Sequence, residues 1–291
     1  MNNTILAIDL GKYKSVACIY RSAQDQQFTT ITTTKTELTR LVARHQANIV
    51  LIEACLLCGW VRDLCLELGV TCLVANTTSE AWKFKHLKRK TDRDDAKRLA
   101  EVYVLGKFPP VVVPIKEVRE KRGLIETRQK LVGRRVALQN RIRSILVGQG
   151  LPAPCGAKAW TQIGLAGIAA HAQPIADCSP LELWRGRLHL ALAELKHVQQ
   201  LLDQAEKKLD GLAKDNEGMQ LLDTIPGVGP RTAEAVVAFL PAPKRFRTAK
   251  QVSAYGGLVP RPYQSADTCL AVASPSAVRR RCASCWSNAP G

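Results

Sequence analysis

This sequence of 291 residues lacks the features of a membrane or exported protein. It has no run of about 18 apolar residues, the length at which a helix becomes a candidate membrane span. The N-terminal stretch MNNTILAIDLGKYKS also lacks the basic region followed by an apolar region that is typical of a secretion signal. We therefore expect a cytoplasmic protein with no membrane anchor.

Acidic residues are scarce. There are 25 Asp and Glu residues against 42 Lys and Arg residues, which gives a formal net charge of +17. The cations recur along the whole chain instead of forming one tail. This charge predicts a polyanionic partner, with nucleic acid as the first candidate and an anionic membrane surface as the second.

The ten cysteines lack the arrangement of a zinc site. Cys55 and Cys58 have ligand spacing, as do Cys282 and Cys285, but neither pair has a nearby His or a second pair placed to complete a tetrahedral site. Several other cysteines lie in apolar runs, where reduced Cys behaves as a small hydrophobic residue. We expect reduced thiols in a reducing compartment.

The first part of the chain reads as an α/β domain. Three β-rich segments are followed by alternating helix and strand, an order that predicts a mixed sheet and matches the ribonuclease-H-like fold. A proline-containing connector, FPPVVVP, closes this domain near residue 115. The expected strands are two within residues 4–20 and one each at 27–34, 48–53 and 70–75; the expected helices are 36–45, 59–68 and 90–105.

Four acidic residues occupy chemically meaningful positions in this domain. Asp9 ends the first strand and Glu53 ends the fourth, at the sheet edge where sites form in open α/β folds. Asp92 and Asp95 are three residues apart, so they share a helical face with Cβ atoms about 5–6 Å apart. Carboxylates this close repel unless a cation lies between them, and Mg²⁺ ions would serve. The alternative is a helix start whose aspartates complement the helix dipole.

An ATP-binding fold is a weaker alternative. Sugar kinases and actin-like ATPases also carry an Asp-x-Gly after the first strand, here Asp9 to Gly11. Those folds need a second glycine-rich phosphate loop and an adenosine loop, and we find neither in this sequence.

Two long amphipathic helices are expected in residues 116–215. Residues 117–146 place Leu124, Leu131, Leu138 and Ile145 at heptad intervals, and residues 181–212 carry a second apolar stripe. The segment between them is low in charge and predicted to be irregular. Together they predict an antiparallel coiled coil that spaces domains or dimerises. The first helix has a basic face that is either solvated or binds phosphates.

A glycine-containing turn predicts a second nucleic-acid contact. Residues 221–233 include Ile-Pro-Gly-Val-Gly between two helical patterns, which is typical of a helix-hairpin-helix. Gly227 and Gly229 permit a tight turn whose backbone N–H groups can hold a phosphate without reading sequence. The alternative is an ordinary packing element.

These motifs occur in an order that resembles one protein family. The four acids, the heptapeptide Lys90–Ala96, the hairpin and the box Ala254–Arg261 are similar to those of DEDD transposases of bacterial insertion sequences (families 110 and 1111), which are related to the Piv invertase. The resemblance covers roughly residues 1–265. It implies a RuvC-like domain (1–115), a coiled-coil linker (116–215) and a mainly helical transposase domain (216–291).

The resemblance also implies chemistry and partners. Mg²⁺ would be held by Asp9, Glu53, Asp92 and Asp95, and Ser265 matches the family's serine nucleophile. An element-encoded bridge RNA would pair with donor and target DNA, leaving backbone contacts to a homo-oligomer (a dimer or tetramer) associated with the bacterial nucleoid. The expected nucleic-acid contacts are Lys90, Arg93, Arg128, Arg134, Arg135, Gly227, Gly229, Arg231 and Arg261.

The chain departs from the family pattern after Ser265. The family continues with Gly, a basic Gly-rich stretch and a helix, whereas here Ala266-Asp267-Thr268 leads into a tail rich in Ala, Ser, Arg and Cys. We interpret residues 266–291 as the product of a shifted reading frame. Two alternatives to a recombinase therefore stay open: a RuvC-like metal-dependent nuclease that does not use Ser265, and an inactive nucleic-acid-binding remnant.

Overall fold

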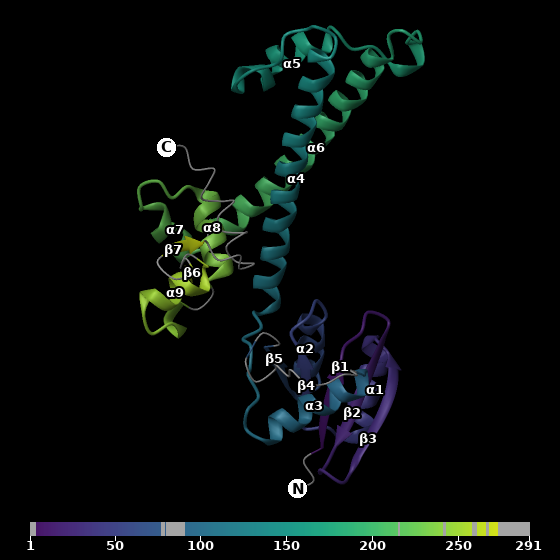
Figure 1. Cartoon of the computed structure of the whole chain (residues 1–291), viewed down its shortest axis with the longest axis vertical. Helices are drawn as coiled ribbons and strands as arrows, with labels where there is room; N and C mark the ends of the chain where they lie inside the picture. Colours follow the sequence, from purple (N-terminus) through teal and green to yellow (C-terminus); the bar gives the residue numbers. More distant parts are fainter. Residues whose placement is uncertain are drawn as a thin grey trace. The chain divides into compact units, whose positions relative to one another are not determined.

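The computed structural model describes residues 4–76, 79, 91–214, 216–240, 243–257, 261–265 and 268–272, with backbone alone for the last two segments. The chain divides into two compact units, residues 1–119 and 120–291 (Figure 1). Our first predicted boundary lies close to this division. The predicted linker and C-terminal domain fall together in the second unit. Among the described helices, none has the length and apolarity needed to cross a membrane.

The first unit is built on a five-stranded mixed sheet of order β3-β2-β1-β4-β5. β1, β2 and β3 form an antiparallel meander, whereas β4 is parallel to both β1 and β5. This order fits the ribonuclease-H-like fold that the sequence predicts. The elements are β1 (Ile5–Asp9), β2 (Lys14–Tyr20), β3 (Gln26–Thr32), α1 (Lys35–His45), β4 (Ile49–Glu53), α2 (Cys58–Glu67), β5 (Thr71–Ala75) and α3 (Asp92–Val104).

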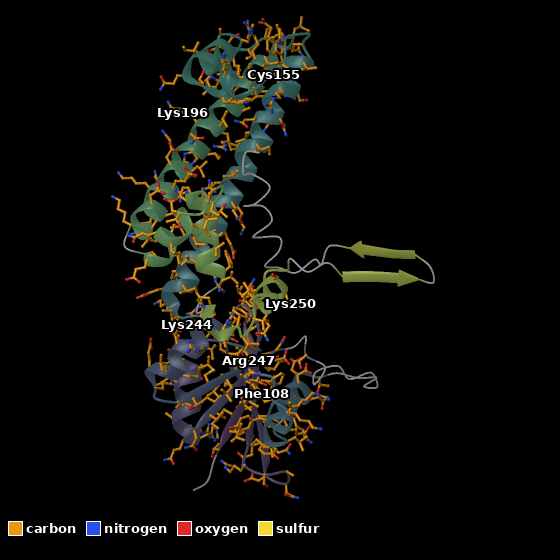
Figure 2. The ribbon with its side chains drawn as sticks, turned by 90° about the vertical axis from the view of Figure 1, so that its left-hand side faces the viewer. Phe108, Cys155, Lys196, Lys244, Arg247 and Lys250 are labelled. Carbon is orange, nitrogen blue, oxygen red and sulfur yellow. The ribbon has the colours of Figure 1, made fainter. Side chains whose placement is uncertain are left out.

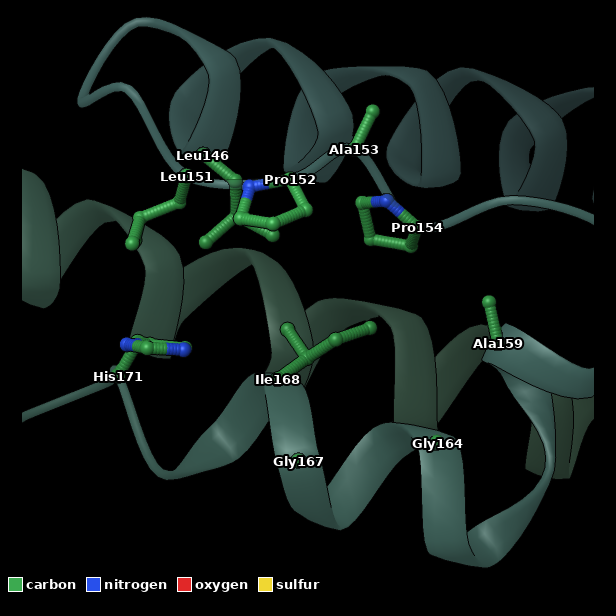
Figure 3. A pocket seen from close by; sticks show the side chains of 10 residues that line it. All are labelled: Leu146, Leu151, Pro152, Ala153, Pro154, Ala159, Gly164, Gly167, Ile168 and His171. Atoms are coloured by element: carbon green, nitrogen blue, oxygen red, sulfur yellow. The ribbon is translucent and has the colours of Figure 1, made fainter.

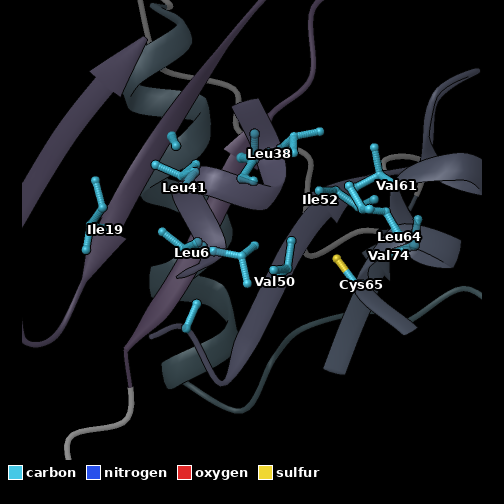
Figure 4. Packing of buried hydrophobic residues seen from close by; sticks show 14 residues of the cluster. Leu6, Ile19, Leu38, Leu41, Val50, Ile52, Val61, Leu64, Cys65 and Val74 are labelled. Atoms are coloured by element: carbon cyan, nitrogen blue, oxygen red, sulfur yellow. The ribbon is translucent and has the colours of Figure 1, made fainter. Parts of the chain in front are cut away.

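Both faces of this sheet are apolar and both are covered. Successive residues of a strand point to opposite faces. Leu6 and Ile8 of β1 therefore pack in one cluster with α1 and α2 (Figure 4). Ile5 and Ala7 face the other way and pack in a second cluster with Leu99 of α3. The unit has three layers, with α1 and α2 on one face of the sheet and α3 on the other.

The second unit is organised around α4 (Lys116–Val147) and α6 (Leu183–Ala213). They pack antiparallel: Ile125, early in α4, shares a cluster with Leu209, late in α6, while Ile145 and Leu188 share another. In α6 the buried leucines recur every seven residues, at Leu188, Leu195, Leu202 and Leu209. The predicted long helices and their apolar stripes are thus present, and the supercoiling of a coiled coil stays a prediction.

The segment between these helices is more regular than we expect from its sequence. It contains η2 (Ala157–Trp160), α5 (Gln162–Ala169) and η3 (Ile175–Asp177). The hydroxyl of Thr161 accepts a hydrogen bond from the Gly164 N–H (3.4 Å) and so caps α5. Ile168 of α5 borders a pocket of about 280 Å³ whose lining carries neither a carboxylate nor a Lys or Arg side chain (Figure 3). We interpret this pocket as a packing feature.

The rest of the second unit is a series of short elements. Its helices agree with the predicted mainly helical domain, but the two-stranded hairpin that follows them was not predicted. Of the predicted atypical tail, residues 266–291, only residues 268–272 are described. The elements are α7 (Glu217–Asp223), α8 (Pro230–Phe239), η4 (Pro243–Arg245), α9 (Ala249–Tyr255), β6 (Arg261–Ser265) and β7 (Thr268–Val272).

Candidate active site and nucleic-acid interface

Two of the predicted site acids end neighbouring parallel strands. Asp9 is the last residue of β1 and Glu53 the last of β4, and the pairing of Ile8 with Ile52 puts both acids at the same level of the sheet. Strand alternation places Asp9 on the same face as Ala7, which packs towards α3. Both acids are half-buried. The sheet therefore carries a carboxylate pair at its carboxyl edge, on the α3 side.

The other two acids lie in the first turns of α3. Ala96 and Leu99 of this helix are buried against the sheet. Asp92 precedes Ala96 by four residues, and Asp95 precedes Leu99 by four, so both acids continue the sheet-facing side of the helix. Asp95 is half-buried and Asp92 is exposed. Both pairs of acids therefore face the space between the sheet and α3.

Asp94, between them, has a different function. Its Oδ2 accepts hydrogen bonds from the Thr91 hydroxyl (2.6 Å) and the Thr91 N–H (3.2 Å). The Thr91 hydroxyl in turn accepts one from the Asp94 N–H (3.3 Å), which completes a capping box. Asp94 therefore serves to cap the helix, while Asp92 and Asp95 take no part in this capping box.

The four acids are not drawn into one metal-binding cluster. In the part of the chain that the structure describes, no three His, Cys, Asp or Glu side chains are grouped so that they could hold a metal ion. Like charges at short range repel, so closing such a set needs the charge of a cation. The donor set itself fits Mg²⁺, because carboxylate oxygens are the ligands this ion takes. Lys90, predicted beside these acids, lies outside the described residues.

Most of the predicted nucleic-acid-binding arginines are engaged within the protein. Arg128 of α4 pairs with Glu206 of α6 (2.7 Å), and Arg134 pairs with Glu194 (3.0 Å). Arg93 lies over the ring of Phe28 at 5.9 Å from its centroid. The first two contacts connect Arg128 and Arg134 of α4 to α6.

Arg135 differs from its neighbours on α4. Its Nε is buried and has no hydrogen-bond partner within the described residues. It borders a pocket of about 700 Å³ between α4, α5 and α6, together with Trp160 and Lys196. Of the three predicted α4 arginines, this one is not in an ion pair in the described part of the chain.

Arg231 bridges two helices through acids. Its guanidinium donates to Glu234 of α8 (2.7 Å) and to Asp210 of α6. The Glu234 side chain is only 2% exposed. Burial raises the pKa of Glu234, and the adjacent Arg231 opposes that rise. Arg231 therefore has a structural role that its place beside the hairpin did not predict.

Replacing Arg231 with alanine is expected to lower the free energy of unfolding by about 3 kcal/mol, because Glu234 is left buried without its cation. Urea denaturation measures this. Arg134→Ala is the matched control, with an expected loss below about 1 kcal/mol, since its pair with Glu194 is exposed. Equal losses in the two variants would contradict the structural role of Arg231.

The predicted hairpin turn has the expected backbone. Gly227 has φ of +83°, in the region that favours glycine, between α7 and α8. Gly229 is the N-cap of α8, and Pro230 occupies the first helical turn. This geometry is compatible with a helix-hairpin-helix. Its contact with phosphate stays a prediction.

Ser265 and Arg261 lie at opposite ends of β6. Ser265 pairs with Thr268 at the closed end of the hairpin, and Arg261 pairs with Val272 at its open end. Ser265 is therefore the last residue of β6 and pairs with the first residue of β7. The roles predicted for these two side chains stay predictions.

Two transposase family models match the sequence. A transposase model of the IS110 DEDD type matches residues 6–149, a range that includes all four acids. The model described as the transposase IS116/IS110/IS902 family matches residues 219–280, which include the α7–α8 turn and Ser265. This second match extends past residue 265, where we expected the resemblance to end. The family pattern therefore continues into part of the tail.

The sequence is also similar to individual transposases. The transposase for insertion sequence element IS1111A of Coxiella burnetii is 32% identical to this chain. The match covers 60% of this chain and 47% of the length of that transposase. A probable family 20 transposase of Pseudomonas aeruginosa is 30% identical over 75% of this chain and 62% of its own. The chain thus spans roughly half to three fifths of these relatives. The RuvC structure of Thermus thermophilus matches 37% of this chain and 99% of the RuvC chain, with 13% identity and a TM-score of 0.26. Because this score is low, the fold assignment rests on the strand order of the sheet.

Proposed function

Because this chain belongs to the IS116/IS110/IS902 family of transposases, we propose that it breaks and rejoins DNA strands to move an insertion sequence. One observation carries the proposal. Asp9 and Glu53 end neighbouring parallel strands and face the helix that begins with Asp92 and continues to Asp95. Carboxylates gathered at one sheet edge are the donor set of metal-assisted phosphoryl transfer.

The metal would be Mg²⁺, held by Asp9, Glu53, Asp92 and Asp95. When bound, it supplies charge stabilisation at the reacting phosphate and activates a hydroxyl nucleophile. Asp9 and Glu53 hold fixed positions because their strands are paired on both sides within the sheet. The capping box at Thr91 fixes where α3 starts, and hence the direction of the helical acids. In this proposal the sheet and the capping box position the four carboxylates that would hold the metal.

Ser265 would act as the nucleophile of strand exchange. Its hydroxyl oxygen would bond to a DNA phosphorus, the bond to the adjacent sugar oxygen would break, and the released DNA hydroxyl would take up a proton. A serine hydroxyl is a weak nucleophile unless a base or metal activates it. The acidic residues would do this, supplied by another copy within a dimer or tetramer. The protein–DNA phosphoester conserves the bond energy for rejoining.

A guide RNA encoded by the element would select the DNA sites in this proposal. The support is the family membership and the formal net charge of +17, which suits a large polyanionic partner. Base pairing would supply sequence choice, while protein cations bind the phosphate backbone.

Sequencing the RNA that co-purifies with the protein tests this part. With the gene expressed beside its flanking DNA, we expect one discrete RNA species that maps next to the gene. Heterogeneous cellular RNA, or no RNA, would contradict guidance by RNA. The matched control expresses the gene without its flanks, and the discrete species should then be absent.

A RuvC-like nuclease is the second candidate. Asp9, Glu53, Asp92 and Asp95 all lie in the first unit, residues 1–119, which has its own three-layer core. Hydrolysis by metal-activated water would need that unit alone and no serine. The two candidates differ in whether protein becomes covalently attached to DNA.

A further inference from the structure

A short segment of the second unit concentrates positive charge. Residues 244–250, KRFRTAK, contain four cations in seven positions, and residues 243–257 contain no Asp or Glu. The cations lie on η4, on the start of α9 and on the link between them, and all four are exposed. Figure 2 labels three of them. We call this set the η4–α9 basic cluster: Lys244, Arg245, Arg247 and Lys250.

This cluster differs from the arginines that the sequence singled out. Arg128, Arg134 and Arg231 are each paired with a carboxylate of the same unit. Among the described residues, no ion pair involves a member of the η4–α9 basic cluster. Its charge is therefore not offset by neighbouring acids, which makes it available to an external anion.

Hydrogen bonds fix the backbone of this segment, and two rings hold the side chain of Arg245. The Arg247 N–H donates to Gln251 Oε1 (2.8 Å), and Thr248 caps α9 by accepting from the Gln251 N–H (3.4 Å). The Arg245 guanidinium lies 4.6 Å from the centroid of the Phe246 ring and 4.7 Å from that of Tyr255. A pre-organised cluster loses less conformational entropy when it binds a ligand.

We propose that the η4–α9 basic cluster binds the phosphate backbone of duplex DNA. Proteins that bind unpaired nucleotides stack their bases on free aromatic faces. Phe246 and Tyr255 are half-buried, and they contact Arg245 and each other, with ring centroids 5.2 Å apart. They do not form an open stacking surface, so the exposed chemistry is cationic. The assignment rests on the proposed function, which requires DNA, and adds a contact surface to it.

The test is duplex binding by the full-length triple variant Lys244→Gln/Arg247→Gln/Lys250→Gln. Each phosphate contact adds about 0.9 to the slope of log affinity against log salt, so the slope should become shallower by about 2 to 3. Affinity near 0.1 M salt should fall about tenfold or more. Fluorescence anisotropy over a salt series measures both, with a random duplex and single-stranded RNA as parallel probes.

The matched control is Lys196→Gln/Lys207→Gln/Lys208→Gln, which removes the same charge from exposed positions of α6. It should keep nearly the wild-type slope. Equal losses in both triple variants, or a loss for RNA alone, would overturn the assignment while leaving the proposed function intact. A wild-type chain that binds no duplex at all would overturn both. Circular dichroism of the two variants checks that the fold is kept.

Discussion

Asp95→Asn is expected to abolish metal-dependent DNA strand cleavage, with a rate loss on the order of a thousandfold. Asparagine keeps the size of the side chain but removes the negative charge that a divalent ion requires. Asp9→Asn should have the same effect, because Asp9 ends β1 and faces the same space between the sheet and α3. Cleavage of a DNA substrate at increasing Mg²⁺ measures the loss.

Asp94→Asn is the matched control for this experiment. Asp94 lies in the same helical turn as Asp95, and its substitution changes the charge equally. The Asp94 carboxylate, however, accepts the two hydrogen bonds from Thr91 that cap α3. We expect it to cost about 1 kcal/mol of stability and to leave cleavage nearly unchanged. If Asp94→Asn and Asp95→Asn lost activity equally, the acids would act through the helix or the overall charge and not through a metal.

A second readout separates binding from chemistry. Mg²⁺ or Mn²⁺ should raise the melting temperature of the wild-type protein, because a ligand that binds only the folded state stabilises it. That rise should be absent in Asp9→Asn and in Asp95→Asn and be kept in Asp94→Asn. A metal-induced rise that persists in the first two variants would place the metal elsewhere.

Ser265→Ala is expected to eliminate the covalent protein–DNA intermediate and with it strand exchange. Alanine removes the hydroxyl oxygen that would bond to phosphorus, so no phosphoester to the protein can form. Labelled DNA that migrates with the denatured protein on a gel detects the intermediate. Ser253→Ala, in α9, is a control that removes a hydroxyl from the same unit and should leave the covalent product.

This variant also decides between the two candidate functions. A recombinase loses both the covalent product and strand exchange in Ser265→Ala. A RuvC-like nuclease keeps cleavage in Ser265→Ala, never forms the covalent product, and loses cleavage in Asp9→Asn. Cleavage that persists in Asp9→Asn would contradict both mechanisms, since each depends on the acidic residues of the first unit.

Much of the first unit could be predicted from local sequence. Its central strands are short, nearly continuous apolar runs. Thr91 supplies a cap, and α3 starts within two residues of the predicted position. Two elements were missed for identifiable reasons. Gly164 and Gly167 lower the helix propensity of α5, and Pro262 argues against a strand in β6, although a two-stranded hairpin leaves an open side on which proline is tolerated.

The candidate site was predicted as a set of residues but not as an arrangement. The positions of Asp9 and Glu53 follow from the strand pattern and the rule that sites form at carboxyl edges. The distinction between Asp94 and its neighbours does not, because it depends on which carboxylate turns back to Thr91. The η4–α9 basic cluster is visible in the sequence as KRFRTAK, but the sequence does not distinguish it from the basic helix α4, some of whose arginines are paired with acids of a distant segment.

The sequence by itself determined the order of elements in the first unit, the family and the acidic residues, because each depends on short-range patterns and fixed spacings. Only the tertiary structure decided which cations are available to nucleic acid. Arg128 and Glu206 are 78 residues apart in the chain, and Arg134 and Glu194 are 60 apart, yet antiparallel packing of α4 and α6 brings each pair together. Ion pairing depends on proximity in space, and proximity between distant segments is created by the packing of the core.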